Sequence, residues 1–344
     1  MERTGVGITA DTTLPDVILP QGITVSGSVQ DSDLQPVPGV DLNFVDSLSG
    51  VQIYTIRDNS DAAGAFAVVV PPDLYDIAFR PSVGSTLAPK RLEAVNLPVN
   101  TTLPAVTLNQ GFIVSGLVKD SAGTGLENVD LDFFDSATKQ LVFTIRDHTD
   151  LAGNYAVVVE PGTYNIQFIP PPASTFVAER LADVAVAGDL ALPEVVLPAG
   201  VAVTGRVISS LGAGIAGIDL DFFDDATDLG VFTPRDISGT DGSFRVVVGA
   251  GTYNIHFIPP AGGRLLGVRL ADVALPADTL LPDVVMGEGF LVSGGVFDGL
   301  GAPVPGVDLE FFDSVTNAKV FTANDDTGAS GLYSVPVPAG TYTI

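Results

Sequence analysis

The chain has 344 residues with 41 acidic and 15 basic side chains, which gives a net charge of −26 at pH 7. A polyanion of this strength repels phosphate backbones, so nucleic acid is excluded as an expected partner. Cysteine is absent, which excludes disulfides and thiolate metal sites. No stretch reaches the ~18 apolar residues of a membrane span, and the first 21 residues lack the apolar core of a secretory signal.

Glycine and proline punctuate short apolar runs along the whole chain. There are 38 Gly and 25 Pro, and Val, Ile, Leu and Phe occur in short pieces between Gly, Pro, Asp and Ser. This pattern is typical of short strands joined by turns, and no stretch shows the periodicity of a helix. We therefore expect an all-β protein with very little helix.

One eight-residue string recurs with a period of 89 residues: VDLNFVDS starts at 40, VDLDFFDS at 129, IDLDFFDD at 218 and VDLEFFDS at 307. A fixed period of this length indicates tandem domains, each large enough to close its own core. The period predicts the closing strands of a partial repeat at 1–21, repeat 1 at 22–110, repeat 2 at 111–199, repeat 3 at 200–288, and an incomplete repeat 4 at 289–344.

The elements of one copy can be followed in chain order in repeat 2. A first strand is expected over 111–120, and a second over 129–135, where Val129, Leu131 and Phe133 face the core. Further strands are expected over 141–147, 154–160, 162–169, 179–186 and 192–197. About seven strands without room for a crossover helix predict two antiparallel sheets packed face to face, a β-sandwich.

Successive copies are joined almost without linkers. The string LPEVVLPAGVAVTGRV runs from the last strand of repeat 2 into the first strand of repeat 3 across Pro198, Ala199 and Gly200. Short junctions that contain proline restrict the angles between neighbours. We expect the array to be semi-rigid.

The strings VSGLVKDSAGTGLENVDLDFFDSATKQ and TDLAGNYAVVVEPGTYNIQFIPP, with their counterparts, resemble the carboxypeptidase regulatory-like domains. The most specific parts are V-S-G-x-V, D-x-x-G-x-Y/F and G-T-Y-x-I, and the likeness covers each full copy. Repeat 3 departs from it at VISSLGAGIAG. The resemblance implies a Greek-key antiparallel sandwich, transthyretin-like or immunoglobulin-like, that recurs in tandem in bacterial surface and secreted proteins. It implies no catalytic residues.

Aspartates are the polar residues that recur in every copy. Asp58 and Asp61 in RDNSDAAG, and Asp147 and Asp150 in RDHTDLAG, lie in glycine-containing loops. Carboxylates are ligands that Ca²⁺ prefers, so these four residues are calcium candidates. The alternative is that the aspartates end strands and cap turns through nearby backbone N–H groups. Repeats 3 and 4 break the loop pattern, which favours the turn interpretation, and no other cofactor is indicated.

Two further features recur beside the aspartates. Phe134 and its counterparts Phe223 and Phe312 face away from the core, and we expect them to pack under a loop of their own domain. An arginine precedes the repeated aspartate in three copies, as Arg146 does, and a cross-strand ion pair with Asp132 is its expected contact.

No arrangement of catalytic residues recurs. The two histidines, His148 and His256, occupy unrelated positions, so we expect no enzyme. The sequence indicates a structural repeat protein of the cell surface or extracellular space, a stalk, adhesin segment or fibre subunit, with its signal and anchor outside this chain. The alternative is a multivalent module that recognises carbohydrate or protein through its loops or outer sheet. An exposed row of aromatics would favour that alternative.

The two ends of the chain fall inside the period. Met1 aligns with Glu179, and Ile344 aligns with Ile166. Either the chain is an excerpt of a longer array, or copies join head to tail by strand complementation, with residues 6–19 of one chain pairing with 289–344 of the next. A head-to-tail contact that does not close a ring gives a filament.

Overall fold

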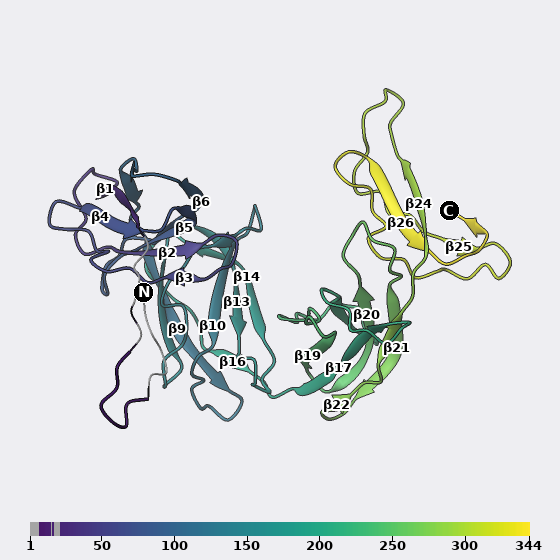
Figure 1. Ribbon diagram of the computed structural model, residues 1–344. Coiled ribbons are helices and arrows are strands. Elements are labelled where there is room, and N and C mark those ends of the chain that lie inside the picture. Colours follow the sequence, from purple (N-terminus) through teal and green to yellow (C-terminus); the bar gives the residue numbers. More distant parts are fainter. Residues whose placement is uncertain (1–6, 15, 17–20) are drawn as a thin grey trace. The chain divides into compact units, whose positions relative to one another are not determined.

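The computed structural model describes residues 7–14, 16 and 21–344, which form strands β1 to β27 and no helix (Figure 1). A helix long and apolar enough to cross a membrane is therefore not found among these residues. By internal contacts the chain divides into two compact units. Unit 1 comprises Met1–Lys119, Thr124–Phe168 and Arg180–Val195, and unit 2 comprises Asp120–Gly123, Ile169–Glu179 and Val196–Ile344.

Repeat 1 is a sandwich of two four-stranded sheets. Its strands are β1 (Ile23–Asp31), β2 (Asp41–Asp46), β3 (Gln52–Ile53), β4 (Ala65–Val70), β5 (Asp73–Arg80), β6 (Lys90–Leu97), β7 (Thr101–Thr102) and β8 (Val106–Leu108). One sheet has the order β4-β1-β7, with β8 also paired to β1, and the other has the order β3-β2-β5-β6. Along β4, Phe66, Val68 and Val70 are buried and the residues between them are exposed, the period of two that turns one face of a sheet to the core.

Repeat 2 follows the same order, repeat 3 follows it without a counterpart of β3, and repeat 4 follows it in part. Repeat 2 forms β9 (Phe112–Asp120), β10 (Asp130–Asp135), β11 (Leu141–Val142), β12 (Asn154–Val159), β13 (Gly162–Ile169), β14 (Glu179–Val186), β15 (Leu190–Ala191) and β16 (Val195–Leu197). Repeat 3 forms β17 (Val201–Ser209), β18 (Asp219–Asp224), β19 (Ser243–Val248), β20 (Gly251–Ile258), β21 (Val268–Leu275), β22 (Thr279–Leu280) and β23 (Val284–Met286). Repeat 4 forms β24 (Phe290–Gly295), β25 (Phe312–Asp313), β26 (Leu332–Val337) and β27 (Tyr342–Thr343). The predicted all-β tandem array of sandwiches is confirmed.

The long strands pair antiparallel, as predicted, and short parallel strands add to them. β7 and β8 run parallel to β1, with Thr101 opposite Val25 and Val106 opposite Val29. Repeats 2 and 3 show the same parallel pairing. The chain crosses between the two sheets after β6, which lets a parallel pair form without a crossover helix. Pro104 separates the two short strands, because proline has no N–H to donate to the ladder.

A phenylalanine from the second strand and a tyrosine from the fifth centre each core. Phe133 is fully buried, and its ring meets that of Tyr164 edge-on with centroids 6.0 Å apart. The Tyr164 hydroxyl donates to the Glu160 carbonyl at 2.7 Å, which closes the corner of the sandwich. The predicted register of the second strand is confirmed by the equally buried Phe44, Phe222 and Phe311.

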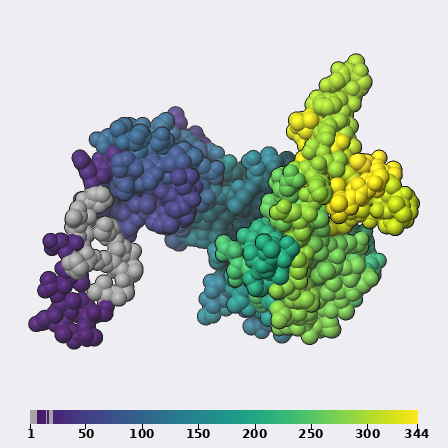
Figure 2. Space-filling model, turned by 45° about the vertical axis from the view of Figure 1, so that its right-hand side comes forward, coloured from purple at the N-terminus to yellow at the C-terminus, as the bar shows by residue number. Residues whose placement is uncertain are grey.

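The predicted closing strands at 1–21 fall largely outside the described residues. Residues 7–14 and 16 are described; they are exposed and lie in no strand. Residues 1–6, 15 and 17–20 lie outside the described part of the chain. In unit 2 the last four residues, 341–344, at the yellow end of the colour range in Figure 2, are exposed or half-buried. The limits of the individual repeats stay predictions.

Candidate functional site

Each repeat brings two aspartates together at the start of its second strand. In repeat 2 the Leu131 N–H donates to the Asp147 carbonyl at 2.8 Å, and Asp130 forms an isolated antiparallel bridge with His148. This pairing sets Asp130, the first residue of β10, beside Asp147. The same backbone pairing in the other repeats places Asp41 beside Asp58, Asp219 beside Asp236, and Asp308 beside Asp325.

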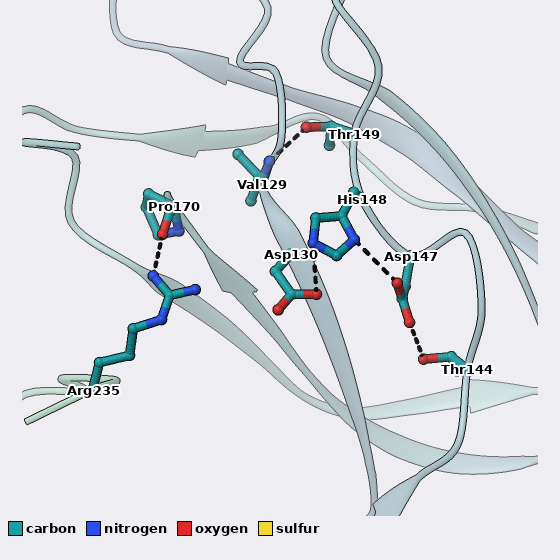
Figure 3. A network of polar contacts seen from close by, with 8 residues as sticks. All are labelled: Val129, Asp130, Thr144, Asp147, His148, Thr149, Pro170 and Arg235. Carbon is teal, nitrogen blue, oxygen red and sulfur yellow. Dashed lines mark hydrogen bonds and ion pairs between the residues drawn. The ribbon is translucent and has the colours of Figure 1, made fainter. Parts of the chain in front are cut away.

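In repeat 2 a histidine lies between these two carboxylates (Figure 3). His148 Nδ1 is 3.2 Å from Asp147 Oδ1, and His148 Nε2 is 3.7 Å from Asp130 Oδ1. Thr144 donates its hydroxyl to the other Asp147 oxygen at 2.6 Å. Within the described residues, these three side chains place one potential metal ligand each within 4.8 Å of one another. The two ring nitrogens face different carboxylates, so the imidazole lies between the two acids and each nitrogen has a carboxylate beside it.

The structure separates the predicted calcium candidates into two roles. Asp61 and Asp150 close turns: each carboxylate accepts two backbone N–H bonds, at 2.8 and 2.9 Å. The bond from the Asn154 N–H is the main reason that the pKa of Asp150 lies below its usual range. Asp58 and Asp147 face the second strand instead. Asp150 therefore takes no part in the group around Asp147, and the calcium site stays a prediction.

Cations of the protein itself lie near the aspartate pair in other repeats. In repeat 1, burial raises the pKa of Asp41, the charge of Asp58 adds to the rise, and two nearby arginines act to lower it. In repeat 4, Lys319 donates to Glu310 at 2.7 Å, and this bond, together with the surrounding acids, raises the pKa of Lys319. Side chains thus supply part of the neutralising charge that a bound metal ion would otherwise supply.

A second recurring contact joins each repeat to the preceding one. In unit 1 the Arg146 guanidinium donates to the Pro81 carbonyl at 2.9 Å, and in unit 2 Arg235 donates to the Pro170 carbonyl at 2.7 Å (Figure 3). Asn324 makes the equivalent bond in repeat 4 at 2.8 Å, and each donor lies 65 residues after its acceptor. All three donors have a positive φ, of 55° to 60°, which is uncommon for residues other than glycine.

Sequence reasoning missed this junction contact. The pattern predicted a cross-strand ion pair for Arg146, whereas the structure gives its guanidinium a proline carbonyl of the preceding repeat. A signal was present, because a proline and an arginine or asparagine recur with the same 65-residue separation in three copies. A separation of that size indicates a contact only once the packing of neighbouring repeats is known.

Backbone hydrogen bonds tie the short linkers to the same proline-containing loops. The Gly200 N–H donates to the Thr175 carbonyl at 2.7 Å, and the equivalent bonds recur in the linkers before and after it. A side chain at Gly200 would meet the Val248 carbonyl at 2.5 Å, so only glycine fits this close approach. Each of these linker glycines is therefore held against the loop whose carbonyl accepts its N–H.

The outward-facing phenylalanines are half-buried. The ring of Phe223 contacts that of His256, with centroids 4.6 Å apart, and its backbone is bridged to Gly230 in its own hairpin. Phe134 and Phe312 are half-buried as well. These residues do not form the exposed aromatic row that would favour a binding module.

Comparisons with known proteins give likenesses to solved structures only. No family model matches the sequence, and no curated protein matches it. The chain is similar to the Bacillus anthracis TIE protein, with 10% identity over 77% of this chain and 50% of that chain, at a TM-score of 0.23. The Streptococcal ancillary pilin matches with 12% identity over 78% of this chain and 99% of that one, at a TM-score of 0.23. BcpA, the major pilin subunit of Bacillus cereus, matches with 12% identity over 78% of this chain and 100% of that chain, at a TM-score of 0.21.

The chain spans about half the length of the first of these structures and nearly the whole length of the other two. At these TM-scores the likeness carries no functional argument. The resemblance to carboxypeptidase regulatory-like domains stays a prediction.

Proposed function

We propose that this protein is a structural repeat protein of the cell surface or extracellular space, acting as a stalk, adhesin segment or fibre subunit. The observation that carries the proposal is the junction contact, in which a side chain bonds to a proline carbonyl 65 residues earlier at three successive junctions. A contact that recurs with the repeat serves the connection between repeats rather than any single domain. Restricted junctions are what a spacer needs, because they hold attached parts at a set distance.

Spin labels can test whether the junction restricts neighbouring repeats. The chain has no cysteine, and Leu48 and Leu151 are 85% and 80% exposed on repeats 1 and 2 of unit 1. We expect a narrow distance distribution for labels at Leu48→Cys and Leu151→Cys, and a broader one after Arg146→Ala. The control is Gln140→Ala, an exposed turn residue of the same repeat. A broad distribution before any junction substitution would overturn the proposal.

We further propose that copies of the chain join head to tail, with residues 6–19 of one copy pairing with 289–344 of another. Among the described strands β24 pairs with β26 alone, whereas β1, β9 and β17 each also pair with two short parallel strands. Val292 of β24 is half-buried, whereas Val25 at the same position of repeat 1 is fully buried. The core of repeat 4 is thus open along the edge where the parallel strands of the other repeats lie.

The segment 6–19 carries apolar side chains in the register that this edge requires. On the 89-residue period Ile8 and Leu14 fall at the positions of Leu97 and Leu103, which belong to the core of repeat 1. Ile8 and Leu14 are 64% and 46% exposed. Residues 6, 15 and 17–19 lie outside the described part of the chain. The described residues of the segment therefore offer two unburied side chains of the kind that the open core lacks.

Light scattering over a wide concentration range tests the assembly separately from the spacer role. We expect the mass of the intact chain to grow with concentration, and Leu14→Asp to weaken association about tenfold or more, because a buried leucine is lost. The matched control is Leu34→Asp, a leucine of repeat 1 that is 70% exposed. A strictly monomeric intact chain would overturn the assembly and leave the spacer proposal standing.

A further inference from the structure

A histidine ring contacts phenylalanine rings from two different repeats inside unit 2. His256 belongs to β20 of repeat 3, and its ring centroid is 4.6 Å from that of Phe223 on β18. The ring of Phe321, which comes from repeat 4, lies 4.7 Å from the same imidazole. His256 is therefore part of the contact between repeats 3 and 4.

Charged side chains from several elements face this histidine. In the sheet, Asp221 on β18 and Arg269 on β21 lie opposite His256 on either side. Asp228, in the turn after β18, is close enough to act on the charge of the ring. Repeat 4 contributes the acids and the base of the pocket that His256 also lines, namely Asp308, Lys319 and Asp325.

Protonation of this imidazole is disfavoured in the folded protein. Burial is the main cause that lowers the pKa of His256, and the positive charge of Arg269 lowers it further. Asp228 acts in the opposite direction with a smaller effect. The neutral ring is therefore the form that packs against the two phenylalanines at pH 7.

The junction between repeats 1 and 2 has the same arginine and phenylalanine positions but no histidine, since Arg91 is the counterpart of Arg269. There Arg91 lies over the ring of Phe143, 4.5 Å from its centroid, and Phe143 is the counterpart of Phe321. The position of His256 is taken by Ala78. A guanidinium keeps its proton throughout the physiological range, so this contact does not respond to pH.

We propose that His256 makes the contact between repeats 3 and 4 pH-responsive, so that the contact loosens when the imidazole takes up a proton. The inference concerns this junction alone and holds whether or not copies of the chain assemble. The unfolded histidine titrates near 6.5, and the pKa in the packed state is lower. The contact is therefore complete above about pH 6.5 and weakens as the pH falls below it.

Distances between labels on repeats 3 and 4 test the response. Leu211 and Val315 are 94% and 90% exposed, one on each repeat. With labels at Leu211→Cys and Val315→Cys, we expect a narrow distribution at pH 7.5 and a broader one at pH 5. His256→Gln, which places the residue of repeat 2 at this position, should remove the difference between the two pH values. A distribution that stays narrow at pH 5, or one that broadens equally in His256→Gln, would overturn the proposal.

The pKa itself can be measured directly, because the chain has only two histidines. Their ring proton resonances can be titrated in the intact protein and assigned with His148→Asn, the residue that repeat 1 has at that position. We expect the resonance that remains in this variant, from His256, to titrate with a midpoint below 6.5. A midpoint at or above 6.5 would show that protonation does not oppose the contact and would overturn the proposal by itself.

Discussion

At the scale of single residues, each sandwich is organised around a phenylalanine packed edge-on against a tyrosine. In repeat 2 these residues are Phe133 and Tyr164, and the tyrosine hydroxyl satisfies its hydrogen bond at the backbone of the preceding turn. The alternation of apolar and polar residues in VDLDFFD was enough to predict that Phe133 is buried. The expectation that a loop of the same domain covers Phe134 did not follow from this alternation, because that side of the strand meets loops whose positions depend on the whole fold.

Replacing the central phenylalanine should destabilise its own repeat. Phe133→Ala removes a fully buried ring, and we expect a loss of about 3–5 kcal/mol in the free energy of unfolding of repeat 2. Urea denaturation measures it, with the half-buried Phe134→Ala as the matched control. A larger loss for Phe134→Ala than for Phe133→Ala would contradict the observed register.

Repeat 2 should become more stable when one of its buried tyrosines loses its hydroxyl. Tyr155 is 5% exposed, and its hydroxyl finds no hydrogen-bond partner within the described residues. Burial raises the pKa of Tyr155 to about 12, and the same position is phenylalanine in repeats 1 and 3, at Phe66 and Phe244. We expect Tyr155→Phe to stabilise repeat 2 by about 1 kcal/mol, because an unpaired polar group leaves the core. A lower thermal midpoint for Tyr155→Phe would mean that the hydroxyl has a partner.

At the scale of elements, aspartate side chains close the turns, and proline separates the short parallel strands. In the hairpin after β10, Asp135 accepts bonds from the backbone and hydroxyl of Thr138 at 2.7 and 2.9 Å. Turn chemistry of this kind is local, so the sequence predicted it well. The parallel strands β7 and β8 and the junction contact of Arg146 were not predictable in the same way, because their partners lie about 65 to 80 residues away in the chain.

These turn aspartates should make the protein sensitive to acid. The backbone bond from Thr138 is the main cause that lowers the pKa of Asp135 below 3.8, and Asp46, Asp224 and Asp313 in the equivalent turns are lowered by equivalent bonds. A carboxylate with a lowered pKa stabilises the folded state above its unfolded pKa, and this stabilisation is lost as the pH falls through the folded value. We expect the thermal unfolding midpoint to decrease as the pH drops below about 4, and to decrease less in Asp135→Asn. A midpoint that does not change between pH 5 and pH 2 would contradict this assignment.

At the scale of the whole molecule, one sandwich recurs with small changes at its aspartate pair and at its junctions. The period of the sequence was sufficient to predict the tandem all-β architecture. The candidate site was predicted only in part: Asp147 was identified, but its neighbours Asp130 and His148 come from pairing between a strand and a following turn. Asp150, predicted beside it, caps a turn. Proximity of that kind follows from the register of the strands rather than from the spacing along the chain.

The net charge predicts how the molecule responds to calcium. With a charge of −26, any salt relieves repulsion between carboxylates, and a specific calcium site would add stabilisation by mass action. Because the turn aspartates already accept backbone bonds, we expect millimolar calcium to raise the unfolding midpoint no more than sodium chloride of equal ionic strength. A larger rise with calcium that disappears in Asp147→Asn would contradict this and establish the site.

The central claim is that repeats 1 to 3 are equal sandwiches in series, each with its own closed core, as the proposed mechanical role requires. Stretching single intact molecules between their two ends tests it most directly, because each closed domain must then unfold as a unit. We expect repeated unfolding events of equal size, each releasing less than about 300 Å of chain. One 89-residue period extends to about 300 Å, and the length of the folded repeat is subtracted from it. A single cooperative event, or events whose released lengths bear no relation to the period, would contradict the account.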